Sequence, residues 1–528
     1  MFTTRPSPRR LALGFTSLAA SACLIVAGCS NSASDSGSSD GAKGAEAGPA
    51  AGGNISIAIG ADPTNLDPRL SWVGQAYSIN AHIFEPLVFR RATADGGTEL
   101  FPLLATEWEN RDDLTWVFHL REGVTFQNSE PFTAEAVKFT LDTIMDESFS
   151  TPIKTWTASI DSVTAEDPLT VVIKTKTPTR GLLNSLAQVP IVSPEAVGEF
   201  GEEFTLNPVG TGPYPFVSYT PGAIVELERY EDYWGEPGLP DTITWRIMPE
   251  SSSRITALET GEVQIAENIP PDQLPALESK DQVKVLTSPT MRVDFLVVDF
   301  ADKVMDSQKF REGISLAIDR QSLVDNILSG TTEVANSVSP PGTVGYNADL
   351  PKYGYDLDKA KELIAASGYD GSAIQFGAPS GRYQMDSQVG QAIAGMLSAA
   401  GVDVEFEALA WSEFTTQNQA DAYDLYFLGQ TDFTLYPTAF YLPLFHCDSS
   451  RGHYCDEEIS RLIDESAAIL DDAEAAAMYS KIQELLYTEY AVIPLYWEPQ
   501  IMAVSAGVGG FELRQDEYIV VHKTGVAS

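Results

Sequence analysis

Positively charged residues are scarce in this chain of 528 residues. It has 33 Lys and Arg against 74 Asp and Glu, which gives a formal net charge of −41 and a pI of about 4.3. Nucleic acids and anionic membrane surfaces attract clustered cations, so neither is an expected partner. Hydrophobic residues make up 44% and charged residues 20%, which is typical of a folded globular protein. The length allows two to four domains.

Cysteine and histidine are also rare, with four and five residues respectively. Four cysteines are too few for a scaffold built from disulfides, and five histidines leave few general bases. The sequence has no His-Glu-x-x-His motif and no phosphate loop that ends in Gly-Lys-Ser/Thr. We therefore expect a non-enzymatic protein without a cofactor, and a hydrolase is the rival class.

The first 28 residues have the charge order of an export signal. Arg5, Arg9 and Arg10 precede a weakly apolar run from Leu11 to Gly28, and the segment holds no acidic residue. The run ends in Val-Ala-Gly before Cys29, which resembles a bacterial lipobox and implies cleavage before Cys29 and lipidation of its thiol. An uncleaved transmembrane anchor is the alternative, although the run is at the short limit for spanning a bilayer.

Residues 29–53 are predicted to form a flexible tether. Of the 24 residues from 30 to 53, 18 are Ser, Ala or Gly, so the segment has little apolar surface to bury. No later stretch reaches the apolar length of a membrane span. Signal, lipidated cysteine and tether together predict a soluble body outside the cytoplasm, held at the outer face of the cytoplasmic membrane by lipid alone.

The remaining sequence alternates between strand and helix patterns, which predicts α/β layers in more than one domain. The predicted strands are apolar runs rich in β-branched residues: Ile55–Ile59, Trp116–Leu120, Val171–Ile173, Ile224–Leu227, Ile243–Ile247, Phe295–Val298, Leu425–Leu428 and Val492–Tyr496. Three apolar stripes predict helices: 137–145 after the cap Thr133, a helix from Phe310 that stops near Gly330, and 389–400 before Gly401. Asp319 and Arg320 are expected at the polar surface of the second helix.

Ordered blocks of sequence between residues 55 and 505 resemble the extracytoplasmic solute-binding proteins of the peptide/nickel class (family 5), the large receptors of ABC importers. The blocks are Leu66–Pro68, Ile83–Val88, Pro102–Trp108, Leu114–Phe126, Asn207–Tyr214, Phe310–Arg311, Ala317–Arg320, Ala360–Leu363 and Ser367–Tyr369. Asn-Pro-Val-Gly-Thr-Gly-Pro-Tyr at 207–214 is the most specific of them. Its Gly and Pro residues are also typical of a tight turn, and this structural role is favoured over ligand contact.

The resemblance implies a periplasmic-binding-protein-like fold (class II, cluster C) with two hinged lobes and an extra subdomain on the first lobe. Lobe one is expected at 54–290 plus 502–528, with the subdomain near 86–199, and lobe two at 291–501. Thr287–Arg292 and Glu498–Met502 are then the hinge strands, and closure of the lobes expels water from the cleft. The protein is expected to be monomeric and to deliver its solute to a permease served by ATPase subunits.

Two charged residues stand where relatives hold the ends of a ligand. Arg382, in Gly-Arg-Tyr, resembles the arginine that meets a ligand carboxylate in dipeptide and nickel-chelate receptors. Asp432, in Gly-Gln-Thr-Asp, resembles the aspartate that holds a peptide α-ammonium, but it comes one residue early and Gln430 replaces the usual Trp. A solvated loop charge and a turn-forming aspartate are the alternatives. Candidate aromatic residues of the cleft are Trp72, Tyr383, Trp411, Phe433 and Tyr436, with a core position as the alternative for each.

Four potential metal ligands lie within ten residues, at His446, Cys447, His453 and Cys455. In an oxidising compartment we favour a disulfide between Cys447 and Cys455 over free thiols or a zinc site, because adjacent ligands strain tetrahedral coordination. No metal is therefore expected. The resemblance leaves the ligand open: a peptide is the first choice, and a nickel chelate, haem, glutathione or an oligosaccharide are the alternatives.

Overall fold

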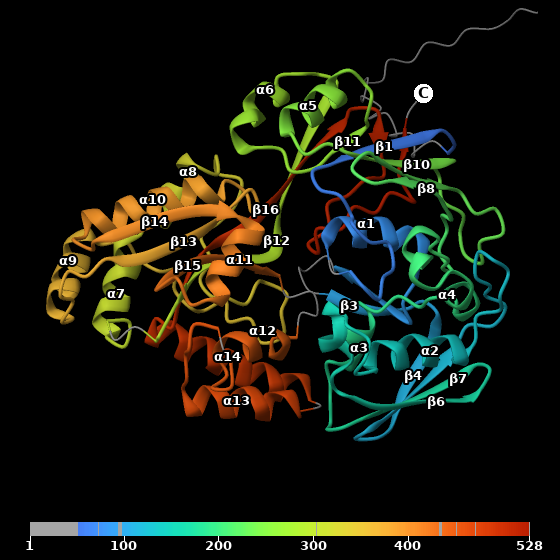
Figure 1. Ribbon diagram of the computed structural model, residues 1–528, viewed down its shortest axis with the longest axis horizontal. Coiled ribbons are helices and arrows are strands. Elements are labelled where there is room, and N and C mark those ends of the chain that lie inside the picture. The colour runs from blue at the N-terminus through green and yellow to red at the C-terminus, as the bar shows by residue number, and fades with distance from the viewer. Residues whose placement is uncertain are drawn as a thin grey trace, which may run out of the picture. The chain divides into compact units, whose positions relative to one another are not determined.

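The computed structural model describes residues 51–71, 73–92, 98–301, 304–431, 436–449, 451–469 and 471–526. Helices and strands are interspersed along this length (Figure 1). Within these ranges, no helix combines the length and the apolar character needed to cross a membrane. Gly52 and Gly53, in the predicted tether, form hydrogen bonds with Leu239 and Asp241, so the ordered body includes them.

A ten-stranded mixed sheet runs through the described body (Figure 1). Its strands, in spatial order, are β14 (Val404–Ala410), β13 (Ile374–Ser380), β15 (Leu425–Thr431), β12 (Val283–Val298), β16 (Val492–Ser505), β11 (Ile265–Ala266), β1 (Asn54–Ile59), β10 (Thr242–Ile247), β9 (Ile224–Glu228) and β8 (Phe216–Thr220). All eight strands predicted from apolar runs are strands in the structure, six of them in this sheet and two in a separate sheet described below.

The long strands β12 and β16 lie at the centre of this sheet and pair antiparallel over most of their length. Residues 283–289 pair with 499–505, and residues 293–297 pair with 492–497. Between Pro289 and Val293 the pairing register shifts. The predicted hinge strands lie at this shift, and their role as a hinge stays a prediction.

Helices cover both faces of the sheet around β12. Phe295 and Val297 contribute to one apolar core and Leu296 and Val298 to the other, as alternation along a strand requires. The first core includes α11 (Trp411–Gln419), α12 (Thr438–Phe445), α13 (Glu457–Ala467) and α14 (Asp472–Glu489). The second includes α7 (Gln308–Ala317), α8 (Arg320–Asn326), α9 (Leu357–Ala366) and α10 (Asp386–Ala399).

A separate four-stranded antiparallel sheet lies in the segment predicted as the subdomain, in the order β4 (Ala105–Asp112), β5 (Thr115–Leu120), β7 (Thr170–Thr175), β6 (Ile160–Asp167). Helix α2 (Ala134–Met145) packs against it. Two short sheets pair β2 (Val88–Ala92) with β3 (Thr98–Pro102), and β17 (Val508–Gly509) with β18 (Gly525–Val526). The remaining α-helices are α1 (Gly74–Ile83), α3 (Leu182–Leu186), α4 (Pro194–Phe200), α5 (Ser251–Glu259) and α6 (Leu274–Glu278).

The second predicted helix is wrong in its extent. Helix α7 ends at Ala317, and α8 begins at Arg320 after Asp319, whose carboxylate accepts a hydrogen bond from the Ser322 N–H. Arg320 is also not a surface residue. The residue is 2% exposed, and its guanidinium donates to the carbonyls of Pro494 and Ser315 at 2.6 and 2.9 Å.

The motif at 207–214 forms a close contact with the end of α1. The Gly212 N–H donates to the Ile83 carbonyl at 2.9 Å, and a Cβ at Gly212 would lie 2.6 Å from the His82 carbonyl oxygen. The Thr211 hydroxyl donates to the Glu85 carboxylate at 2.7 Å, as do Tyr233 and Trp234 at 2.7 and 2.8 Å. Burial raises the pKa of Glu85 to about 7, although the hydrogen bonds from these three donors lower it. Two of the motifs that carry the family resemblance therefore contact each other.

A methyl group at position 212 tests this contact. We expect Gly212→Ala to lower the free energy of unfolding by about 2–3 kcal/mol, because the new Cβ meets backbone atoms that have no room to move. The matched control is Gly198→Ala in α4, where a Cβ would meet nothing within 4 Å. It should stabilise by about 0.5–1 kcal/mol. Urea unfolding measures both, and equal stabilities would contradict the contact.

Candidate ligand-binding site

The loop before α10 presents Arg382. The Asp386 carboxylate accepts the N–H groups of Gly381, Arg382 and Tyr383 at 3.0, 2.7 and 3.0 Å, so three consecutive amides converge on one side chain. Gly381 and Met385 both have left-handed backbone conformations, with φ of 78° and 55°. The backbone of this loop is therefore tightly defined although Arg382 itself is exposed.

The Arg382 guanidinium lies over two aromatic rings, with its central carbon 5.3 Å from the Tyr383 centroid and 5.4 Å from the Trp411 centroid. Trp411, the first residue of α11, is 38% exposed. Among the described residues the Arg382 side chain has no carboxylate within ion-pair distance. An exposed guanidinium beside aromatic rings is suited to bind an external carboxylate.

Tyr383 and Tyr436 are buried, and each is 6% exposed. The Tyr383 hydroxyl donates to the Gly429 carbonyl at 2.9 Å, and burial raises the pKa of Tyr383 to about 12 although the neighbouring arginines oppose this. Tyr436 contacts Tyr479, with ring centroids 5.6 Å apart, and lies beside Gly181. The structure thus brings Arg382, Tyr383 and Trp411 together. Trp72, Asp432, Phe433 and Cys29 lie outside the described residues.

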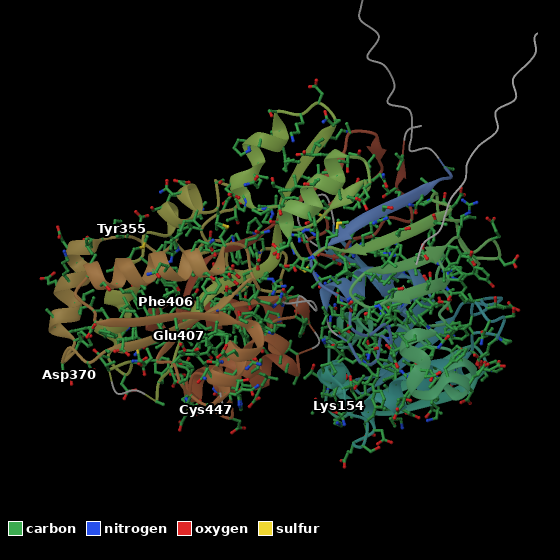
Figure 2. All side chains as sticks on the ribbon, turned by 45° about the horizontal axis from the view of Figure 1, so that its top comes forward. Lys154, Tyr355, Asp370, Phe406, Glu407 and Cys447 are labelled. Atoms are coloured by element: carbon green, nitrogen blue, oxygen red, sulfur yellow. A yellow bond between two sulfur atoms is a disulfide. The ribbon has the colours of Figure 1, made fainter. Side chains whose placement is uncertain are left out.

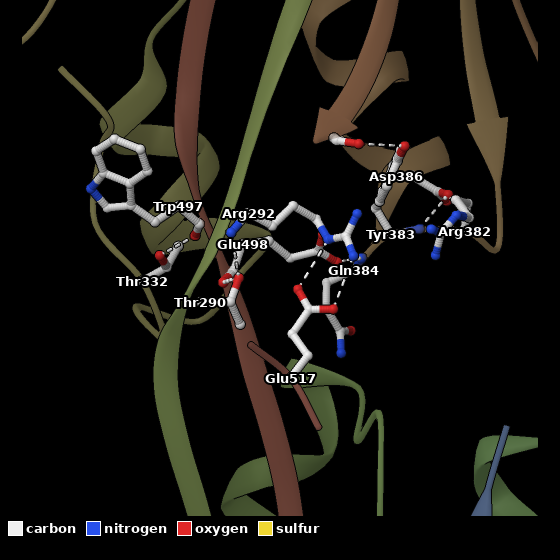
Figure 3. A network of polar contacts seen from close by, with 11 residues as sticks. Thr290, Arg292, Thr332, Arg382, Tyr383, Gln384, Asp386, Trp497, Glu498 and Glu517 are labelled. Atoms are coloured by element: carbon white, nitrogen blue, oxygen red, sulfur yellow. Dashed lines mark hydrogen bonds and ion pairs between the residues drawn. The ribbon is translucent and has the colours of Figure 1, made fainter. Parts of the chain in front are cut away.

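Sequence reasoning missed a buried charge network beside this loop (Figure 3). Arg292, on β12, donates two hydrogen bonds to the Glu517 carboxylate at 3.1 and 2.9 Å, and its Nε lies 3.0 Å from Glu498 Oε2 on β16. Glu498 Oε1 accepts the Gln384 N–H at 3.0 Å. The available signal was the presence of charged residues inside otherwise apolar strands, Met-Arg-Val-Asp-Phe at 291–295 and Trp-Glu-Pro at 497–499.

Burial shapes the charges of this network. Burial by itself lowers the pKa of Arg292. The negative charges of Glu517 and Glu498 have the larger combined effect, so the pKa of Arg292 lies above its ordinary value. Burial raises the pKa of Glu498 to about 7, against the attraction of Arg292. Asp294 is 0% exposed, and burial together with the Glu498 charge raises its pKa well above the ordinary value. Arg292 is therefore a single buried cation that interacts with several carboxyl groups.

The four residues first considered as metal ligands do not form one cluster. Cys447 and Cys455 are joined by a disulfide, and the Cys447 N–H donates to Ser460 in α13 (Figure 2 labels Cys447). His453 instead contacts Asp299, with Nδ1 2.8 Å from Oδ1. Asp421 lies near this pair, but Asp421 and His453 are exposed, so the group does not by itself indicate a metal site.

Two lobes that share a sheet through two central strands define the fold of a periplasmic binding protein. Residues 99–452 match the family described as bacterial extracellular solute-binding proteins, family 5 (middle part). The chain belongs to this family, whose members are transport receptors and not enzymes. The predictions of the fold class and of a solute-binding protein for ABC import are thus confirmed.

Individual relatives match over nearly their whole length. The glutathione-binding protein GsiB of Escherichia coli O6:K15:H31 is 28% identical over 485 residues, which is 88% of this chain and 92% of the relative. The structure of DppA from Helicobacter pylori, in complex with the peptide STSA, has a TM-score of 0.79 and 25% identity and covers 91% of this chain and 99% of its own. CtaP from Listeria monocytogenes has a TM-score of 0.81 at 22% identity, with 90% and 100% covered.

Removal of the disulfide gives a test of its contribution. The disulfide between Cys447 and Cys455 closes a nine-residue loop. Replacing both cysteines by serine should therefore lower the free energy of unfolding by about 2.6 kcal/mol on the chain-entropy estimate. Urea unfolding of the double variant measures this, and peptide mapping of exported protein without reduction should recover the linked fragments. Free thiols in the exported protein would contradict the pairing.

Proposed function

We propose that this protein binds a short peptide between its lobes and delivers it to an ABC permease. The observation that carries the proposal is the exposed guanidinium of Arg382, held over Tyr383 and Trp411 without a carboxylate partner among the described residues. Arginine offers a planar pair of donors that matches a carboxylate. The carboxyl terminus of the peptide would bind here, and closure of the proposed lobes, 54–290 with 502–528 and 291–501, would remove water from the contact.

The charge of the chain favours a zwitterion over a simple anion. A net charge of −41 repels anions at long range, whereas a peptide with one ammonium and one carboxylate carries no net charge. Asp432 is the proposed partner of the ammonium, and Trp411 would provide a wall of the site. Main-chain hydrogen bonds to the peptide and water-filled side-chain pockets would make binding tolerant of sequence.

The comparisons support a peptide as the solute class. The solved relative at 25% identity holds a tetrapeptide, and the curated relatives at 28% identity are named for glutathione, which is itself a small peptide with carboxylate ends. Ser-Thr-Ser-Ala, which carries no net charge, and glutathione, whose two carboxylates outnumber its single ammonium, are therefore the first solutes to test, and their comparison shows whether net charge matters.

We also propose that the mature protein starts at a lipidated Cys29 and is tethered outside the cytoplasmic membrane by residues 30–53. The support is the order of arginines, apolar run and Val-Ala-Gly-Cys in the sequence. The family description as extracellular agrees with export but does not bear on the lipid.

A chemical change in the ligand tests the Arg382 contact. Titration calorimetry with glutathione and with Ser-Thr-Ser-Ala should detect binding to the wild-type protein, and Arg382→Ala should weaken it roughly 30-fold or more, as for loss of one partner of a desolvated charge pair. For a terminal-carboxylate contact, amidation of the tetrapeptide should weaken wild-type binding to a similar degree and leave binding to Arg382→Ala nearly unchanged.

The matched control is Arg461→Ala, which removes a guanidinium that is 54% exposed on α13 and should bind both peptides normally. Wild-type affinity in Arg382→Ala would refute the anchor. Binding of Ni(L-His), haem or an oligosaccharide in place of both peptides would refute the solute class.

Replacement of Cys29 tests the anchor. Without the thiol no lipid is attached, so Cys29→Ala should release the protein from membranes into the medium or the periplasm. Cell fractionation followed by immunoblotting measures the shift. A variant that stays in the membrane fraction would indicate an uncleaved apolar anchor instead.

A further inference from the structure

Glu498 connects the loop that presents Arg382 to the paired central strands β12 and β16. Asp386 accepts the N–H groups of residues 381–383, but the next amide, that of Gln384, points to Glu498 Oε1 at 3.0 Å. Glu498 belongs to β16, which is 114 residues further along the chain than this loop. The loop is thus held from two directions, by its own helix and by a central strand.

The second oxygen of the same carboxylate faces Arg292. Glu498 Oε2 lies 3.0 Å from Arg292 Nε, and the two side chains are 11% and 9% exposed. The Thr290 hydroxyl supports this pair, because it donates to the Glu498 carbonyl and accepts the Arg292 N–H, at 2.9 and 3.0 Å. These contacts join β12 and β16 where their pairing register shifts.

Arg292 extends the connection to the C-terminal segment. Its Nε and Nη2 donate to Glu517, which is 27% exposed, and the neighbouring Gln515 carbonyl accepts the Met291 N–H at 2.9 Å. A continuous path of contacts therefore runs from Glu517 through Arg292 and Glu498 to the Gln384 amide, two residues from Arg382 (Figure 3).

We propose that Glu498 is a positioning residue for ligand binding, which fixes the Arg382 loop and couples it, through Arg292, to the position of the C-terminal segment around Glu517. This inference rests on the proposed role of Arg382 and adds residues that do not touch the solute. When the segment around Glu517 moves relative to the central strands, the partners of Arg292 change, and the loop loses or gains its support from Glu498. Ligand binding by Arg382 and the position of the Glu517 segment relative to β12 and β16 are thereby linked.

A double-mutant cycle separates positioning from general stability. Glu498→Gln keeps an acceptor for the Gln384 amide and loses the charge that faces Arg292. It should weaken binding of Ser-Thr-Ser-Ala roughly tenfold, and Glu498→Ala, which loses both, should weaken it more. In an Arg382→Ala background each change should cost less than about twofold, because Glu498 acts through Arg382. Additive losses would indicate a merely structural role and would overturn the proposal.

The far end of the path has a matched control. Glu517→Gln should weaken binding about threefold, since its ion pair with Arg292 is partly exposed. Glu489→Gln removes a similar partner, 45% exposed, from the buried Arg311 and should leave binding unchanged. Equal affinities of the Glu517 and Glu489 variants would remove the C-terminal segment from the path.

The pH dependence of binding is a second readout. Glu498 faces Arg292, Glu517, Arg382, Asp294 and Tyr496, and its pKa is raised to about 7. Below that pH the carboxyl is protonated and loses its ion pair with Arg292, so wild-type affinity should rise from pH 6 to pH 8. Glu498→Gln should lose this rise. An identical pH profile in the two proteins would contradict the role of the charge.

Hydrogen exchange tests the loop without a solute. Glu498→Ala should speed exchange of the Gln384 amide by tenfold or more, and Glu498→Gln should leave it near the wild-type rate. If Arg382→Ala binds normally, the proposed function fails regardless of the Glu498 variants. If Arg382→Ala loses binding but the Glu498 variants retain both binding and the exchange rate, only the present inference fails.

Discussion

A buried arginine, Arg292, at the register shift between the paired strands β12 and β16 constrains much of the surrounding structure. Removing a guanidinium from water costs several kcal/mol unless charged partners with good geometry replace the water. Arg292 has such partners only because Glu498 and Glu517 come from two other chain segments. The positions of β12, β16 and the C-terminal segment are therefore linked electrostatically as well as by packing. A buried ion pair is weak evidence for stability, but it does specify which segments must meet.

Most of the architecture was predictable because it depends on local pattern. Apolar runs such as Leu425–Leu428 are strands, and Gly401 ends α10 with φ of 95°. The failure at residues 318–330 has a physical cause. Periodicity places a charge such as Arg320 on the surface, but the carbonyls of Pro494 and Ser315 satisfy it in the interior. The partner at 494 is 174 residues away, so no local pattern reports it.

The candidate site was predictable only in part, for the same reason. Resemblance to relatives points to Arg382, and its exposure over Tyr383 and Trp411 agrees with that assignment. The residues that support it lie up to 225 positions apart, as Arg292 and Glu517 do, and each is an ordinary charge in its own local sequence. The motif at 207–214 behaves differently. Its Gly and Pro residues predict a structural role, and its residues form hydrogen bonds with Ile83, His82 and Glu85.

Because acidic residues are abundant, an exposed arginine that has no ion pair among the described residues, as Arg382 has none, is an unusual feature. In a chain with 74 carboxylates, a guanidinium readily finds one as a partner and is then no longer available to a solute. Three described acidic residues near the Arg382 loop have other partners. Asp386 accepts the amides of its loop, Glu498 is shared between Gln384 and Arg292, and Glu517 pairs with Arg292. The buried network thus holds the loop, and it pairs the Glu498 and Glu517 carboxylates with Arg292. Within the described part of the chain no carboxylate lies at ion-pair distance from Arg382, so an external carboxylate can take that place.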